Sequence, residues 1–122
     1  MTQQDKEMLE QNGFDVSGAL RRFINNEALY LQCLGKFLSD TSYDKLKKAL
    51  EEGDCKTAFH EAHTMKGFVS NLGMVELYET VSVIVEMLRA DNMEVSEQMQ
   101  TLDKVYEKDY NIIDEIIKNC PH

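Results

Sequence analysis

Apolar residues recur at helical spacing along most of the chain. Positions three or four residues apart fall on one face of a helix, so the pattern predicts helices at about residues 16–23, 26–38, 42–50, 54–72, 75–90 and 94–118. Asp15, Asn26 and Asp54 are candidate N-caps for three of them, because a short acceptor side chain can bind the free N–H groups of a first turn. Gly73 is predicted to end the helix over 54–72.

The predicted helices are joined by short loops, so consecutive helices should run antiparallel. We therefore expect an all-α fold, an up-and-down four-helix bundle with short additional N-terminal helices, forming a single domain over residues 1–122. The Val/Ile runs at 81–85 and 112–117 would also fit buried strands, but their flanking helix formers favour helix. A hydrophobic content of 43% is enough for a single core and argues against a disordered chain. Only 6 glycines and one proline argue against an all-β fold, which needs more turns.

The charge balance narrows the range of partners. The chain has 13 Lys and Arg against 22 Asp and Glu, a net charge of −9. Such a field repels phosphate backbones and anionic lipid, so neither nucleic acid nor a membrane is an expected partner. The polar N-terminus does not resemble a signal peptide. Cys33, Cys55 and Cys120 form no CxxC pair, so we expect reduced thiols and a cytoplasmic location.

The predicted helix over 54–72 contains residues that its packing does not explain. Its apolar stripe consists of Cys55, Ala58, Ala62, Met65, Val69 and Leu72. At about 100° per residue, His63 lies roughly 130° from the centre of that stripe and should be exposed. Gly67 follows four residues later on the same side, although a glycine inside a helix costs about 1 kcal/mol relative to alanine. Lys66 places an ammonium group within one turn of His63.

An exposed histidine with a cation and a cleared surface beside it suits phosphoryl transfer to an imidazole. Imidazole has a pKa of about 6.5, so it is mostly the neutral, nucleophilic form at pH 7. Lys66 would partly neutralise the dianionic phosphoryl group on His63. The sequence shows no carboxylate cluster for Mg²⁺ and no phosphate-binding glycine loop. A partner must therefore bring the phosphoryl donor and its metal.

The stretch AHTMKGFVSNLG, residues 62–73, resembles the signature of histidine-containing phosphotransfer (HPt) domains. That signature has a histidine, then Lys-Gly after two residues, and a second glycine ten residues after the histidine. His63, Lys66, Gly67 and Gly73 occupy these positions. The resemblance implies that His63 accepts the phosphoryl group, that Lys66 stabilises it, that Gly67 gives a docking domain access, and that Gly73 ends the helix.

The resemblance also implies partners and cofactors. The partners would be response-regulator receiver domains, which supply phospho-aspartate and Mg²⁺, and a hybrid histidine kinase. The protein would be a phosphocarrier with no kinase activity and no cofactor or metal of its own, and we expect a monomer. Several members of the family have Gln or Glu on the next helix to orient the histidine ring. Gapless counting places Val85 there, which leaves Glu86 as the candidate.

Other residues near His63 are candidates for the docking surface. Phe59 should be half-buried between the apolar stripe and His63, and His60 and Ser70 are assigned to the same surface. His60 also fits a plain solvated side chain. A metal site at His60 and His63 is a weaker alternative, because the segment is HEAH and not the HExxH of metalloproteases, and no third ligand is evident.

Two alternative functions remain open from the sequence. One is a non-phosphorylating helical adaptor of the HPt type that binds a receiver or kinase domain; Val85 at the orienting position favours it. The other is a metal-dependent hydrolase on a four-helix bundle. The lack of paired Glu-x-x-His motifs argues against a hydrolase.

Overall fold

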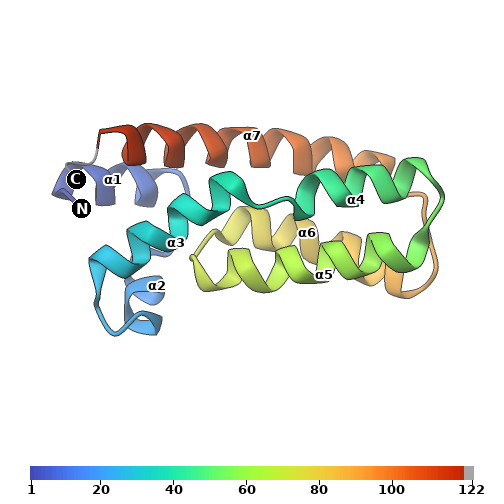
Figure 1. The fold of residues 1–122 in the computed structure, drawn as a ribbon, viewed down its shortest axis with the longest axis horizontal. Helices are drawn as coiled ribbons and strands as arrows, with labels where there is room; N and C mark the ends of the chain where they lie inside the picture. Colours follow the sequence, from blue (N-terminus) through green and yellow to red (C-terminus); the bar gives the residue numbers. More distant parts are fainter. Residues whose placement is uncertain (120–122) are drawn as a thin grey trace.

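The computed structural model describes residues 1–119, and these form seven helices. The helices are α1 (Gln3–Gln11), α2 (Val16–Arg22), α3 (Glu27–Ser39), α4 (Ser42–Glu51), α5 (Cys55–Asn71), α6 (Val75–Arg89) and α7 (Ser96–Lys118). In Figure 1, α3 and α4 follow one another along the long axis, beside the α5–α6 pair and the long α7. The expectation that consecutive helices run antiparallel is therefore wrong for α3 and α4, which are joined end to end. The predicted all-helical bundle is therefore confirmed, with α3–α4, α5, α6 and α7 as its long members and α1 and α2 as the short N-terminal helices.

The helix boundaries follow the predicted local signals. The side chains of Asp15, Asn26 and Asp54 each accept a hydrogen bond from the backbone N–H three residues further on, so all three predicted N-caps are confirmed. The Val/Ile runs at 81–85 and 112–117 lie inside α6 and α7, as the helix prediction required. No helix within residues 1–119 is both long enough and apolar enough to cross a membrane.

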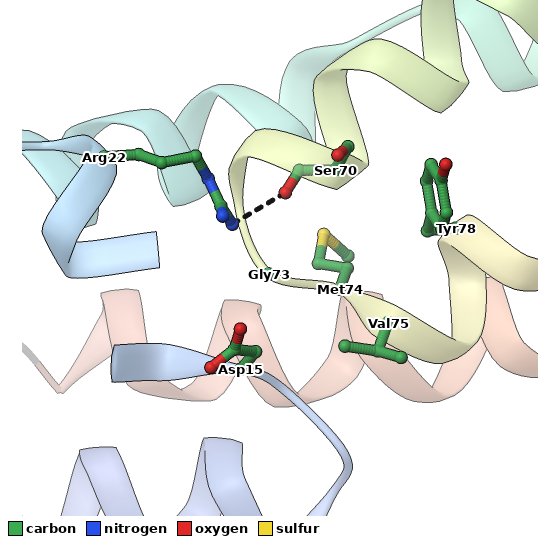
Figure 2. Close-up of a pocket in the computed structure, with 7 residues that line it drawn as sticks. All are labelled: Asp15, Arg22, Ser70, Gly73, Met74, Val75 and Tyr78. Carbon is green, nitrogen blue, oxygen red and sulfur yellow. Dashed lines mark hydrogen bonds between the residues drawn. The ribbon is translucent and has the colours of Figure 1, made fainter. Parts of the chain in front are cut away.

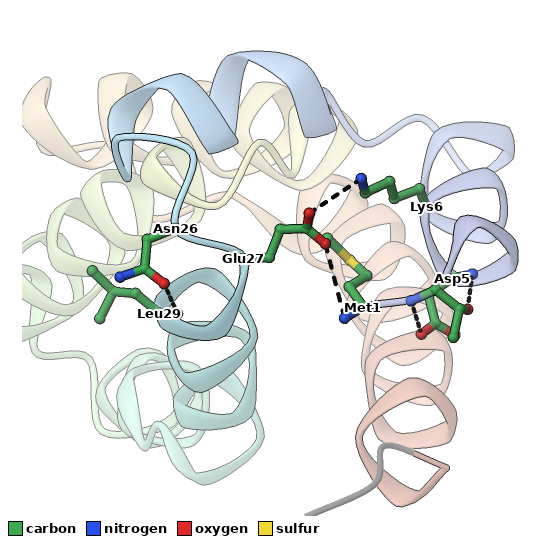
Figure 3. Close-up of polar contacts among 7 residues, drawn as sticks. Met1, Asp5, Lys6, Asn26, Glu27 and Leu29 are labelled. Atoms are coloured by element: carbon green, nitrogen blue, oxygen red, sulfur yellow. Dashed lines mark hydrogen bonds and ion pairs between the residues drawn. The ribbon is translucent and has the colours of Figure 1, made fainter.

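Helix α1 was not predicted, because its sequence is mostly polar. Thr2 and Asp5 form a capping box at its start, and Leu9 is its fully buried residue. The ammonium of Lys6 lies 3.4 Å from the carboxylate of Glu27 at the start of α3 (Figure 3). A capped polar helix with one buried leucine gives a weak apolar periodicity, which explains why the pattern missed it.

The turn from α5 into α6 is built around Gly73. Its φ is +73°, and a Cβ at this position would lie 2.4 Å from the backbone oxygen of Asp15. The backbone N–H of Asp15 also donates to the carbonyl of Gly73 at 2.8 Å. The prediction that Gly73 ends the helix is confirmed, and the packing of the α1–α2 loop on the turn adds a second reason for glycine.

The last carbonyl groups of α5 are bound by side chains from other helices. Arg22 of α2 donates to the carbonyls of Ser70 (2.8 Å) and Asn71 (3.3 Å). The buried hydroxyl of Tyr30 donates to the carbonyl of Leu72 at 2.9 Å. These bonds satisfy groups that a helix end leaves without a partner, so the C-terminal end of α5 is held rigidly against α2 and α3.

We expect Gly73→Ala to destabilise the protein by roughly 2–4 kcal/mol, since it combines a positive φ with a backbone clash. Gly53 is the matched control, because its φ is +71° but a Cβ there has no atom within 4 Å. Gly53→Ala should therefore lose only about 1 kcal/mol. Urea unfolding measures both variants. Equal losses would show that the contact with Asp15 adds nothing.

One carboxylate, that of Asp109 on α7, is buried in the bundle. Its Oδ1 has no hydrogen-bond partner within residues 1–119, and the Lys108 ammonium lies 3.8 Å away. Lys108 also binds the carboxylate of Glu76 and, at 3.5 Å, the carbonyl of Asn12. Burial therefore outweighs the attraction of Lys108 and raises the pKa of Asp109 to about 7.

This raised pKa predicts that stability falls as the pH rises. Between the unfolded pKa of about 3.9 and the folded pKa, the native state holds a proton that the unfolded state releases. The free energy of unfolding should therefore be lower at pH 8 than at pH 5, by on the order of 1–3 kcal/mol. Asp109→Asn should remove most of this dependence, whereas Glu115→Gln, at an exposed position on α7, should keep it. A pH dependence unchanged in Asp109→Asn would refute the assignment.

Candidate functional site

Helix α5 presents one buried face and one exposed face. The buried residues are Ala58, Ala62, Met65 and Val69. On the other side His60, His63 and Gly67 are exposed, while Phe59 and Lys66 are half-buried. The predicted exposure of His63 and the predicted half-burial of Phe59 are both confirmed. His63 thus lies well inside α5, with its side chain exposed to solvent.

Gly67 leaves open space one turn beyond His63. A Cβ built at this position has no atom within 4 Å, so packing inside the protein does not require glycine. Its backbone is not in the left-handed region either. A helix interior disfavours glycine by about 1 kcal/mol, and nothing in the fold compensates for this. The consequence of Gly67 is a flat strip of backbone beside the imidazole.

The ring of His63 packs against the ring of Phe59, with centroids 5.8 Å apart and planes at 35°. The guanidinium of Arg89, from the end of α6, lies over the Phe59 ring at 5.1 Å from its centroid. Glu86 pairs with Arg89 at 3.3 Å. These four side chains form a continuous row that runs from α6 to His63, and we call it the Phe59 row.

The proposed orienting residues on α6 make no hydrogen bond to His63. Val85 is fully buried and has no polar atom to offer. Glu86 is exposed, and its ion pair is with Arg89. Within residues 1–119 no side-chain hydrogen bond holds the His63 ring, so its observed contact is the aromatic one with Phe59.

Lys66 leans toward α6. Its ammonium lies 5.9 Å from the ring centroid of Tyr78, a cation–π arrangement. Neither Tyr78 nor Arg89 was identified from the sequence. The signal for both is the antiparallel α5–α6 hairpin, which places the start of α6 beside the end of α5 and the end of α6 beside the start of α5. The exact partner of each residue depends on the register of the two helices.

The charge of α5 differs from that of the whole protein. The chain carries −9, whereas α5 has Lys56 and Lys66 against a single acidic residue, Glu61. The Arg89 guanidinium adds a further positive charge beside this helix. An anionic group attached to His63 would therefore lie on a helix whose local charge is positive, although the protein as a whole is acidic.

Two hollows flank this face of α5. One, of about 370 Å³, is lined by Cys55, Lys56, Phe59, Leu88, Arg89 and Asp91. The other, of about 180 Å³, lies at the C-terminal end of α5 (Figure 2) and is lined by Asp15, Arg22, Ser70, Gly73, Met74, Val75 and Tyr78. The predicted docking residues Phe59 and Ser70 therefore lie at opposite ends of one face, with His63 between them.

The cysteines and a metal site can be assessed within the described residues. Cys33 and Cys55 are free thiols, and burial together with the nearby Asp91 raises the pKa of Cys55. Cys120 lies outside the described residues. Residues 1–119 contain no group of three or more His, Cys, Asp or Glu side chains that could hold a metal ion.

The fold and the site define a helical bundle that displays an exposed histidine, His63, beside a glycine on an open helix face. Comparison with known protein families matches residues 37–116 to the Hpt domain, which is more than half of the chain. The protein therefore belongs to the Hpt domain family, as the resemblance predicted. Searches of curated proteins and of solved structures give no significant match. Hpt domains are phosphocarriers of two-component phosphorelays that interact with receiver domains, and no kinase domain is detected in this chain.

Proposed function

We propose that this protein is a phosphorelay intermediate whose phosphoacceptor is His63. It takes a phosphoryl group from an aspartyl phosphate of one receiver domain and returns it to an aspartate of another. The observation that carries this proposal is the exposed His63 beside Gly67, where a Cβ would have no atom within 4 Å. The gap admits a partner whose aspartate approaches the ring.

The transfer itself needs little from this chain besides the nucleophile. The lone pair of the outward ring nitrogen of His63 attacks phosphorus, and the bond from phosphorus to the aspartate oxygen breaks. The aspartate leaves as a carboxylate, while the other ring nitrogen of His63 keeps its proton. The receiver domain supplies Mg²⁺ to balance charge on the phosphoryl oxygens. The reverse sequence returns the group.

Lys66 is proposed to stabilise the phosphoryl group on His63. It is three residues further along the same helix, so its Cα lies about 4.5 Å along the axis. Its four-carbon side chain can move from the Tyr78 ring toward an anion on His63, because a cation–π contact is worth only about 0.5–1 kcal/mol at an exposed position. A charge-assisted bond to phosphate is stronger.

The Phe59 row is proposed to orient His63 in place of a hydrogen bond. Phe59 limits the rotation of the imidazole, and the Arg89–Glu86 pair holds Phe59 from the α6 side. In this arrangement Glu86 acts indirectly. The hollow beside Phe59 and the hollow beside Ser70 would receive side chains of the docked domain, with His60 at the rim.

Phosphotransfer from a receiver domain tests this function. Several receiver domains, phosphorylated chemically with a radiolabelled donor in the presence of Mg²⁺, are each mixed with the purified protein. We expect label to move to the protein in a bond that acid hydrolyses and base does not, the behaviour of phosphohistidine. No label from any receiver, with the protein shown to be folded by circular dichroism, would contradict the proposal.

An adaptor function is the second candidate, and the missing hydrogen bond to His63 favours it. Val85 is fully buried, and no side chain within residues 1–119 fixes the ring by hydrogen bonding. An adaptor would bind receiver domains with the same affinity when His63 is replaced. It would also carry no label in the transfer assay.

A further inference from the structure

A groove of about 510 Å³ lies between the start of α4 and the middle of α7. Tyr43 of α4 and Tyr106 and Tyr110 of α7 line it. The rings of Tyr43 and Tyr106 stack with centroids 3.9 Å apart and planes at 15°, and Tyr110 follows Tyr106 at 6.2 Å and 28°. All three side chains are only half-buried, so the groove has a wall of accessible aromatic rings.

The rim of this groove is strongly acidic. Asp40, Asp44, Asp103 and Glu107 line it against a single cation, Lys47. Burial and the neighbouring carboxylates of Asp40 and Asp44 raise the pKa of Tyr106 to about 12. Burial contributes most to this rise, and the negative charges of Asp40 and Asp44 add to it, since both effects disfavour the phenolate.

A groove that combines aromatic rings with carboxylates favours the binding of a cationic ligand. A cation over a ring is attracted by the π quadrupole, and the attraction grows when the pair is partly removed from water. The protein already uses this contact, because the ammonium of Lys47 lies 4.9 Å from the ring centroid of Tyr43. Within residues 1–119 no cation lies over Tyr106 or Tyr110.

The carboxylates on the two walls differ in whether they already have a hydrogen-bond partner. Asp40 accepts from Ser42, and Asp103 accepts from the hydroxyl of Tyr43. Asp44 on α4 and Glu107 on α7 make no hydrogen bond or ion pair within the described part of the chain. One acceptor on each wall is therefore available to a ligand that lies between the helices.

We propose that this groove binds an arginine-containing basic segment of a partner protein. Arginine fits better than lysine, because its planar guanidinium stacks on aromatic rings and donates in a fork to a carboxylate. Tyr110 and the part of Tyr106 that Tyr43 leaves uncovered provide the aromatic contact surface, and Asp44 and Glu107 provide the acceptors. Acceptors on two separate helices suit a segment with several cations rather than one small ion.

The groove lies apart from the face that carries His63. The side chains of α5 next to His63 contact α6: the Phe59 ring contacts Arg89, and the Lys66 ammonium contacts the Tyr78 ring. The groove is lined by α4 and α7, with Leu38 and Asp40 from the end of α3, and by no residue of α5 or α6. A partner held in the groove would therefore leave His63 accessible, and the groove would tether the protein without stopping exchange at the histidine.

Fluorescence anisotropy with a labelled peptide of alternating arginine and serine tests the proposal, at about 150 mM salt to screen distant charges. Asp44→Asn with Glu107→Gln should weaken binding about tenfold or more, consistent with the loss of two charge-assisted contacts. Glu10→Gln with Glu79→Gln removes the same charge from exposed positions on α1 and α6 and should change binding less than about twofold. Circular dichroism confirms that both double variants are folded.

Equal weakening by the two double variants would overturn the proposal, because binding would then depend on net charge alone. A lysine–serine peptide should bind several-fold more weakly, and equal affinity would refute the role of the tyrosine rings. Free argininamide that binds as tightly as the peptide would show a small-molecule site instead. His63→Gln should leave peptide affinity unchanged, so the result is independent of phosphotransfer.

Discussion

The His63→Gln variant should accept no phosphoryl group from any receiver domain, while it stays folded. Glutamine is close in length to histidine and is a good helix former, but it has no nucleophilic nitrogen. Because the side chain of residue 63 is exposed and its ring contacts only Phe59 among the aromatic residues, the free energy of unfolding should change by no more than about 0.5 kcal/mol. The transfer assay and a urea unfolding curve measure the two quantities.

His60→Gln is the matched control for this variant. His60 lies on the same helix, is exposed, and is also a histidine within the predicted docking surface. Label on His60→Gln but not on His63→Gln would assign the phosphorylation to one imidazole. Label that persists on His63→Gln would end the proposal that His63 is the acceptor. If the wild-type protein binds receiver domains but takes up no label, the result would support the adaptor alternative instead.

Most of the fold follows from short-range signals in the sequence. The N-caps at Asp15, Asn26 and Asp54 act within one turn, so a reading of local residues finds them. The exposure of His63 follows from helical geometry once the apolar stripe of α5 is known. The open space at Gly67 also follows from helical geometry, since a residue on the exposed side of a helix has no packed neighbour beside it.

The features that the sequence does not reveal depend on contacts between helices. Arg89 reaches Phe59 only because α5 and α6 are antiparallel in one particular register, which no periodicity specifies. The stacking of Tyr43 on Tyr106 joins residues of α4 and α7 in the same way. The buried carboxylate of Asp109 looks like any polar residue of an amphipathic helix until α7 is packed against its neighbours.

The role of the Phe59 row links these long-range contacts to the chemistry. The pattern of the family suggests a hydrogen-bonding residue on the next helix, whereas this chain has a fully buried valine at position 85. The observed contact of the His63 ring is instead with Phe59, one turn earlier on α5. Under the proposed function, the orientation of the His63 ring would depend on packing, which is less directional than a hydrogen bond but needs no buried polar partner.

Gly67→Glu should block transfer while the protein keeps its stability. A glutamate four residues after His63 projects into the space that the docked domain would enter, and it repels the phosphoryl dianion on the imidazole. We expect the transfer rate to fall by about 100-fold or more, since misplacing the reacting groups by about 1 Å costs about 10²-fold. Stability should be unchanged or rise by about 0.5–1 kcal/mol, because glycine is a poor helix former and a Cβ at position 67 meets no atom within 4 Å.

Three further variants separate the causes of that loss. Gly67→Ala adds only a methyl group and should transfer at close to the wild-type rate, whereas Gly67→Gln has the bulk of glutamate without its charge. A rate for Gly67→Gln between those of Gly67→Ala and Gly67→Glu would show that bulk and charge both contribute. Gln100→Glu adds the same charge at an exposed position on α7 and should have no effect. If Gly67→Glu transfers as fast as Gln100→Glu, the open strip beside His63 is not the docking route, and a partner must reach the imidazole from the side of Phe59.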